Sequence, residues 1–495
     1  MSALYNDRMA AILEPRPEVL QPVLPLVEEI APVLDAWEVA RRLADRPRLL
    51  FLDSATPETA FGRYSYVTAD PFHWLCSRGK DDPFPRLASL LAHYRTAPLP
   101  DLPPFQGGAA GLFGYDLCHH IERLPRPQFD EFEAPDLAVG FCDWVIACDH
   151  QAKRSWLMST GFPETEPRRR RERAERRLRQ VKRWLSNDNH RVARSHPATP
   201  SPRHPVTPSV AYPVPGLPGL TSNFDRNTYL DIVLRAIEYT HAGDCFQVNI
   251  AQRLLHPATI PPLELYRRLR ERNPAPFAGY FDLGDFVIAS ASPERFLRVA
   301  SEGRQVPDEV ETRPIKGTRP RGATPEEDQA RIAELASSPK DRAENIMIVD
   351  LLRNDLGRVC RYGSVRVPAV CRVETYQFVH HLVSEVRGRL REGLGPVDLL
   401  RAAFPGGSVT GAPKIRAMEI IAELEPTARG PYCGCLGYIG FDGSMDTNIL
   451  IRTFTIGRGW IQFPVGGGIV ADSVPEREYE ETWHKAEGLL RALRS

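Results

Sequence analysis

The stretch Cys435–Val465, CLGYIGFDGSMDTNILIRTFTIGRGWIQFPV, indicates the class of fold. It contains three runs of strand-forming residues, at Cys435–Phe441, Asn448–Phe454 and Trp460–Val465, joined by short connections. Strands joined in this way pair antiparallel, because a parallel pair needs a crossover of about a dozen residues or more. The stretch therefore predicts an α+β fold with large antiparallel sheets rather than a doubly wound sheet.

The residues from Asn223 onward continue this pattern of strand groups separated by helices. Further strands are predicted at Phe246–Ile250, Gly279–Phe281 and Phe286–Ala291. Apolar spacing predicts a helix over Tyr229–Ala242 that stops at Gly243. Other helices are predicted at 325–337, 340–353, 397–404, 412–424 and 475–494.

Composition limits the classes of function. The chain has 495 residues with 63 basic and 63 acidic side chains, so its charge gives no bias toward nucleic acid or membranes. No apolar run approaches the ~18 residues of a spanning helix, and the N-terminus lacks the basic-then-apolar pattern of a secretory signal. Nine scattered cysteines suit reduced thiols, and we therefore expect a cytoplasmic protein.

Three regions differ in composition. Residues 1–185 are predicted to form an N-terminal domain of strands and helices, residues 186–218 a Pro-rich linker or surface excursion, and residues 219–495 the domain that carries the chemistry. A very basic helix is predicted at 163–185. Its interspersed glutamates favour a solvated helix over a nucleic-acid site.

Two pairs of acidic residues share a spacing of three. Asp341 and Glu344 lie on the face of a predicted helix that also carries Met347, Ile348, Leu351 and Leu352. Glu478 and Glu481 lie in the last helix, where an apolar stripe through Tyr479, Trp483, Ala486, Leu490 and Leu493 leaves Glu481 on the other side. That second pair is either a solvated acidic face or, where the two pairs meet, half of an all-oxygen magnesium site.

Lys316 lies in the run Thr312–Thr318, TRPIKGT, two residues after a proline and just before a glycine. A lysine in such a rigid segment is either a surface residue of a loop or a buried amine with a lowered pKa. Only the buried amine could act as a nucleophile or proton carrier.

Glycine-rich segments, an arginine and a histidine are further candidates for a binding site. The segment 404–414 leads into a helix, and Gly466–Gly468 ends a strand where a ligand could approach the backbone. Arg452 lies in an apolar run, which predicts either a buried ion pair or capture of an anion on a strand. His381 is either structural or a proton carrier near pH 7.

The chain resembles the chorismate-utilising enzymes, and within them the branch that aminates chorismate at C4 on the route to para-aminobenzoate and folate. The matching motifs in the last part of the chain are AGDCFQVNIAQR (242–253), ASPERF (291–296), TRPIKGT (312–318), DRAENIMIVDLLRND (341–355), HLVSEVRG (381–388), FPGGSVTGAPKIRAMEII (404–421), GYIGFDGSMDTNILIRT (437–453), GGGIVADS (466–473) and EYEET (478–482). The resemblance implies antiparallel sheets packed as a sandwich with helices on the outside.

The resemblance also implies roles for residues. Glu344 and Glu481 would be Mg²⁺ ligands, with Asp341 and Glu478 supporting them. The implied catalytic residues are Lys316, His381, Glu294 and Thr318, and the implied substrate-binding residues are Ser408, Tyr432, Arg452, Gly466, Gly468 and Gln247.

Two positions distinguish branches of the family. Anthranilate synthases usually carry alanine at the position of Lys316, and isochorismate and salicylate synthases carry a water-activating lysine at the position of Gln247. These residues favour amination at C4. The alternatives are an anthranilate synthase component, which aminates C2 and releases pyruvate, and a non-catalytic sensor of chorismate or tryptophan.

The resemblance further implies partners. No amidotransferase nucleophile motif is found, so we expect ammonia from a separate glutaminase subunit. Ser54 matches a pocket where relatives hold tryptophan, although a buried structural serine is the simpler interpretation.

Overall fold

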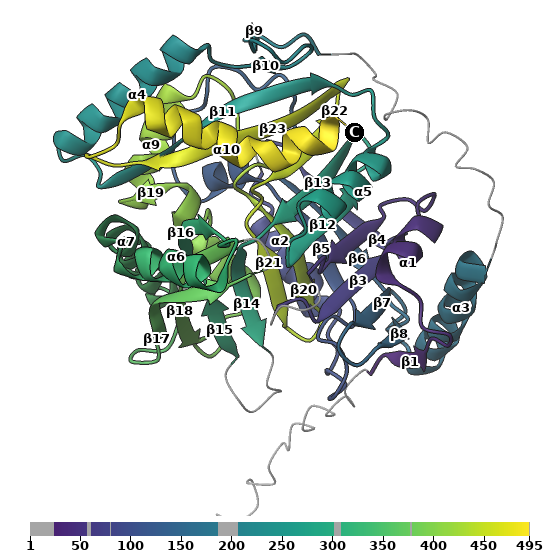
Figure 1. Ribbon diagram of the computed structural model, residues 1–495. Helices are drawn as coiled ribbons and strands as arrows, with labels where there is room; N and C mark the ends of the chain where they lie inside the picture. The colour runs from purple at the N-terminus through teal and green to yellow at the C-terminus, as the bar shows by residue number, and fades with distance from the viewer. Residues whose placement is uncertain are drawn as a thin grey trace, which may run out of the picture.

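The computed structural model describes residues 24–56, 61–79, 81–186, 206–300, 308–376 and 379–494. In these ranges the named strands form two large antiparallel sheets, and helices lie around them (Figure 1). The predicted α+β sandwich is therefore confirmed. Residues 187–205 of the predicted linker lie outside the described residues. None of the described helices is long and apolar enough to cross a membrane.

The larger sheet has 13 strands in the described part of the chain. In spatial order they are β1 (Leu26–Glu29), β8 (Arg154–Ser159), β7 (Trp144–Asp149), β3 (Tyr64–Thr68), β2 (Leu50–Asp53), β12 (Phe277–Asp282), β13 (Phe286–Ser292), β22 (Thr453–Gly457), β23 (Trp460–Ile469), β11 (Gln247–Pro257), β10 (Thr221–Ser222) and β9 (Tyr212–Pro213), with β19 (Gly411–Ala412) beside β11.

The smaller sheet has 10 strands within the described ranges. In spatial order they are β16 (Ile315–Pro320), β18 (Val379–Arg389), β15 (Glu309–Thr312), β14 (Arg295–Ala300), β21 (Met445–Asn448), β20 (Cys435–Gly440), β5 (Gly108–Phe113), β6 (Leu137–Cys142) and β4 (His73–Ser77), with β17 (Arg366–Thr375) beside β18.

Helices cover the outer faces of both sheets, with α10 running across β23 (Figure 1). They are α1 (Ala36–Arg42), α2 (Phe84–His93), α3 (Pro167–Ser186), α4 (Arg226–His241), α5 (Pro262–Arg272), α6 (Pro325–Ser337), α7 (Pro339–Gly357), α8 (Pro396–Ala403), α9 (Lys414–Leu424) and α10 (Pro475–Leu493), with short 3₁₀ turns at Tyr115–His120 and Gly407–Val409. The predicted bounds 325–337 agree with α6. Helix α4 starts three residues before the predicted Tyr229, because the Asp225 carboxylate caps it by accepting from the Thr228 amide at 2.8 Å.

The strand predicted over Asn448–Phe454 is wrong. β21 ends at Asn448 and β22 begins at Thr453, and Arg452 between them has a left-handed φ of 51°. The reason is that the chain passes here from the smaller sheet to the larger one. The Asn448 side chain fixes the crossing, since it accepts from the Leu436 amide and donates to the Phe277 carbonyl, both at 2.8 Å.

Both sheets contain strands from either side of the predicted linker. β2 pairs with β12 through Leu50 and Phe281, and β5 pairs with β20 through Phe113 and Cys435. A core cluster between the sheets mixes the same parts of the chain: Leu50, Tyr66, Ala110, Leu112, Phe281, Ile288, Leu436 and Tyr438. The predicted division into residues 1–185 and 219–495 stays a prediction, and the two parts share their sheets and their core.

This shared core predicts one cooperative unfolding transition. Phe51 on β2 is fully buried in a second core cluster that also mixes both parts of the chain, and its ring meets Tyr266 of α5 with centroids 6.1 Å apart. Phe51→Ala removes that contact and leaves a cavity, so we expect a loss of about 3–5 kcal/mol in the free energy of unfolding. Urea unfolding followed by fluorescence and by circular dichroism should give coincident curves, both shifted. Two separate transitions, with only the first moved, would contradict a shared core.

Candidate functional site

Lys316 lies on β16, at a bulge where β16 faces β18. Gly317 follows with φ 73°, and a Cβ there would lie 2.9 Å from the Asp341 Cγ of α7. The glycine therefore allows α7 to cross close to β16. The Lys316 side chain is 13% exposed, and its Nζ lies 3.9 Å from Glu344 Oε2. Burial lowers the pKa of Lys316, so the structure supports the buried amine rather than the surface lysine.

Acidic residues of α7 and α10 face the same region. A Cβ on Gly467 would lie 3.4 Å from Glu478 Oε2 and 3.5 Å from Glu481 Oε1, so the glycine leaves a gap between the strand and both carboxylates. Glu344 lies close enough to Glu481 for their charges to repel, and burial is the main cause of its raised pKa. Asp341 instead accepts from the Arg319 guanidinium at 3.1 Å.

The buried face of α10 differs from the predicted stripe. It is formed by Glu478, Thr482, Ala486, Leu489 and Ala492. The buried face differs from the predicted stripe because Glu478 is buried. The Ser473 hydroxyl donates to the Glu478 carboxylate at 2.7 Å, and this hydrogen bond offsets the loss of contact with water. Glu481 is half exposed, in agreement with its predicted place on the side away from the apolar stripe.

Lysines accompany these carboxylates. Lys485 Nζ lies 2.7 Å from Glu481 and donates to the Gly466 carbonyl at 2.8 Å, and Lys340 Nζ lies 3.9 Å from Glu344. Neither lysine is among the predicted site residues, although the spacing of four residues from Glu481 to Lys485 and from Lys340 to Glu344 is a usable signal. Among the described residues no three His, Cys, Asp or Glu side chains converge closely enough to hold a metal ion. The gap at Gly467 is bordered by two carboxylates, from Glu478 and Glu481, and by Lys485 Nζ, and a Mg²⁺ ion here stays a prediction.

Glu294 is a buried carboxyl near Lys316. Burial raises its pKa to about 7, against the opposing effects of the Ser408 hydroxyl, the Lys316 charge and the Ile315 backbone. A carboxyl with this pKa can hold or release a proton at neutral pH. The structure therefore places an acid–base group and an amine close enough for their charges to interact.

His381 on β18 is paired with Thr318 across the bulge. Its Nδ1 lies 2.9 Å from the Thr318 hydroxyl, and its ring is buried. Burial, together with the Arg452 charge, lowers the pKa of His381 to about 3. A pKa this low favours the neutral ring at pH 7, and the role of His381 as a proton carrier stays a prediction.

Arg452 projects from the crossing between the sheets rather than from a strand. Burial alone accounts for its lowered pKa, and no ion pair to it is formed within the described part of the chain. A partly buried guanidinium without a carboxylate is costly unless an anion binds to it. Of the two predicted roles, the structure favours capture of an anionic ligand.

The remaining predicted binding residues surround strand β11. Gln247 is fully buried, and neither its Nε2 nor its Oε1 has a hydrogen-bond partner among the described residues. A Cβ on Gly468 would lie 2.3 Å from Gln247 Nε2, and one on Gly466 would lie 2.5 Å from the Ile250 carbonyl. These two glycines therefore make room for the protein itself, and among the three glycines only Gly467 borders the acids. Tyr432 is buried beside Arg429.

Ser54 lines a cavity of about 350 Å³. Its hydroxyl donates to the Tyr64 carbonyl at 2.7 Å, as expected of a buried structural serine. Arg295 and Arg313 also line this cavity, and they are sequence neighbours of Glu294 and Lys316. A tryptophan ligand in this cavity stays a prediction.

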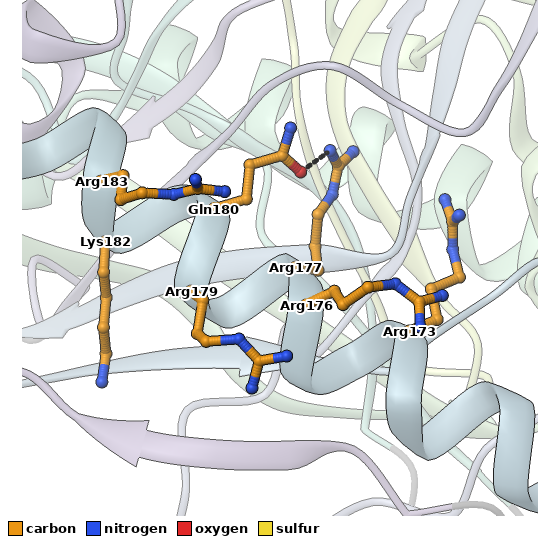
Figure 2. A pocket seen from close by; sticks show the side chains of 7 residues that line it. All are labelled: Arg173, Arg176, Arg177, Arg179, Gln180, Lys182 and Arg183. Atoms are coloured by element: carbon orange, nitrogen blue, oxygen red, sulfur yellow. Dashed lines mark hydrogen bonds between the residues drawn. The ribbon is translucent and has the colours of Figure 1, made fainter.

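The basic helix α3 is remote from these groups. A groove of about 690 Å³ runs along it. Figure 2 shows the side chains that line this groove: Arg173, Arg176, Arg177, Arg179, Gln180, Lys182 and Arg183. Arg177 anchors the helix, since it pairs with Asp70 at 2.7 Å and Asp143 at 3.2 Å. Arg173 also donates to the Phe162 carbonyl at 2.8 Å, whereas Arg176, Arg179 and Arg183 are exposed, as predicted for a solvated helix.

Comparisons with known proteins show the family of the chain. The family described as chorismate binding enzyme matches residues 48–491. Anthranilate synthase component 1 of Thermus thermophilus is 46% identical over 402 residues, covering 80% of this chain and 79% of that protein. Aminodeoxychorismate synthase component 1 of Klebsiella aerogenes is 41% identical over 468 residues, covering 92% and 95%.

A solved structure extends the comparison to the fold. The crystal structure of anthranilate synthase component I from Streptococcus pneumoniae TIGR4 superposes with a TM-score of 0.69 at 29% identity, covering 86% of this chain and 92% of that one. The sequence match spans both parts of the chain and both sheets. The chain therefore belongs to the chorismate binding enzyme family.

Proposed function

We propose that this chain aminates chorismate at C4, giving 4-amino-4-deoxychorismate for the synthesis of para-aminobenzoate and folate in the cytoplasm. The observation that carries the proposal is the buried Lys316, whose lowered pKa favours a neutral, nucleophilic amine. The relative from Klebsiella aerogenes, named aminodeoxychorismate synthase component 1, supports it over nearly the whole chain.

Glu344 and Glu481 would hold Mg²⁺, with Glu478 and Asp341 supporting them. The support for this is that Glu478 and Glu481 lie beside Gly467 and that Glu344 lies close enough to Glu481 for their charges to repel. When bound, the ion would act as a Lewis acid toward the ring carboxylate of chorismate.

The protein residues would carry the two displacements. Lys316 Nζ forms a bond to C2 while both ring double bonds shift and the C4–O bond breaks, and Glu294 gives its proton to the departing hydroxyl, which leaves as water. Ammonia then bonds to C4, both double bonds shift back, the C2–N bond to Lys316 breaks, and the new ammonium group at C4 returns a proton to Glu294. The enolpyruvyl group is retained.

Arg452 would bind a substrate carboxylate by a two-pronged hydrogen bond, because its guanidinium has no ion-pair partner in the described ranges. The neutral His381, oriented by Thr318, would lie against the ring. Ser408, Tyr432, Gln247 and the backbone at Gly466 and Gly468 would complete the pocket.

Ammonia would come from a glutaminase subunit. The relatives are named as component 1, which supports a second component. Ammonium salts should replace that subunit in vitro.

A second candidate is anthranilate synthesis, in which C2 is aminated and pyruvate is released. The 46% identity to the Thermus thermophilus protein favours it. Purified chain with chorismate, Mg²⁺ and ammonium should give the aminated product with no pyruvate. Pyruvate with anthranilate would instead support the second candidate.

A covalent intermediate should depend on Lys316. With chorismate and Mg²⁺ but no ammonia, intact mass should increase by chorismate minus water in the parent protein and not in Lys316→Ala, which should also lose ~10²-fold or more in product formation. Lys182→Ala, on the outer helix, is the control and should keep both the adduct and the rate. An adduct that persists in Lys316→Ala would contradict the nucleophile assignment.

The rate should fall as pH rises through about 7. Burial raises the pKa of Glu294 to about 7, so the protonated acid is present below that pH and lost above it. We expect kcat/KM for chorismate, at a fixed concentration of free ammonia, to decline above pH 7. Glu294→Gln cannot give a proton, so it should reduce the rate by about 10²–10⁴-fold and remove this limb of the profile. An unchanged limb in the variant would assign the pH dependence to another group.

A further inference from the structure

Arg429 forms a buried ion pair that the proposed chemistry does not use. It follows α9 in the chain, and it is 6% exposed while its partner Glu425 is 4% exposed. The guanidinium meets the carboxylate twice, with Nε 2.9 Å from Oε2 and Nη2 2.6 Å from Oε1. Such a bidentate pair has a fixed geometry, and burial makes the loss of either partner costly.

The pair also holds backbone groups of two separate segments. Arg429 donates to the Val409 carbonyl at 2.9 Å and to the Asn249 carbonyl at 2.8 Å. Glu425 accepts from the Ala251 amide at 2.9 Å. One ion pair therefore ties the glycine-rich loop to strand β11.

Four of the predicted substrate-binding residues depend on these segments. Ser408 precedes Val409 in the loop. Asn249 and Ala251 are the register partners of Gly468 and Gly466 on β23. Tyr432 is joined to Arg429 itself, since its amide donates to the Arg429 carbonyl at 3.2 Å.

We propose that Arg429, oriented by Glu425, is a positioning residue that sets the spacing of the walls of the chorismate pocket. It acts through Ser408, Tyr432 and the β23 glycines. Lysine in its place would keep the positive charge but has no planar fork to reach the carboxylate and both carbonyls together. The identity of the bound substrate rests on the family and the proposed function, whereas the clamp itself rests on the hydrogen bonds above.

The test is Arg429→Lys, with Arg177→Lys as a matched control. Arg177 is likewise buried and bound to two acids, but it belongs to α3 and sheet strands remote from the pocket. Both variants should lower the midpoint of thermal unfolding. Only Arg429→Lys should weaken chorismate binding, by about tenfold or more, in calorimetric titration with Mg²⁺ below the unfolding range, with KM rising more than kcat falls.

Glu425→Gln provides a second variant in case Arg429→Lys does not fold. It keeps the size of the side chain and removes the charge that orients the guanidinium, so it should weaken chorismate binding in the same direction. Chorismate affinity and KM equal to those of the parent, in either folded variant, would overturn the proposal. Parent protein that binds chorismate without forming the C4-aminated product would contradict the proposed function while leaving this comparison of affinities intact.

Discussion

The pairing of β11 with β23 determines where the candidate site lies. Ten residue pairs, from Val248 opposite Ile469 to Pro257 opposite Trp460, fix the two strands in register. Helix α10 follows β23 and packs against it. The position of β23 therefore also determines how close the Glu478 and Glu481 carboxylates lie to Gly467. Close contact between the strands at Gly466 depends on the missing side chain, since a Cβ there would overlap the Ile250 carbonyl.

A second constraint is the cost of the charges around this strand pair. The pKa of Lys316 is lowered and the pKa values of Glu294 and Glu344 are raised, each mainly by burial. Burial of this kind disfavours ionisation and lowers stability unless partners compensate. The Arg429–Glu425 pair is fully compensated by mutual contacts and backbone groups, whereas Arg452 has no acidic partner within the described ranges. The Arg429–Glu425 pair therefore needs no ligand to balance its charges, whereas Arg452 requires an anionic ligand.

Local patterns in the sequence were sufficient for much of this arrangement. The bounds of α6 agree with the prediction, because a capping threonine and a proline at its start are local signals. The antiparallel class of sheet followed from short connections. The acids and Lys316 were found as candidates from helical spacing and from a rigid run of residues, and the resemblance to a known family added the idea that they act together.

Features that depend on distant contacts could not be predicted. The run at 448–454 has the composition of one strand, and only the packing of two sheets shows that the chain changes sheet at Arg452. The buried face of α10 differs from the predicted stripe because the Ser473 hydroxyl compensates the burial of Glu478. Apolar periodicity does not include such a contact. The glycine run predicts a place where a ligand approaches the backbone, although neighbouring protein atoms fill the space beside Gly466 and Gly468.

Two lysines compete for the role of nucleophile, and their contacts distinguish them. Lys485 lies 2.7 Å from Glu481 and 2.8 Å from the Gly466 carbonyl, both within hydrogen-bond distance, so two protein oxygens hold its nitrogen in place. Lys316 lies 3.9 Å from Glu344, beyond that distance, and its side chain is more deeply buried. Removing a proton from Lys316 therefore breaks no short hydrogen bond to that carboxylate and relieves the burial of a charge. Burial therefore favours the neutral form of the Lys316 amine, the form that a nucleophile needs.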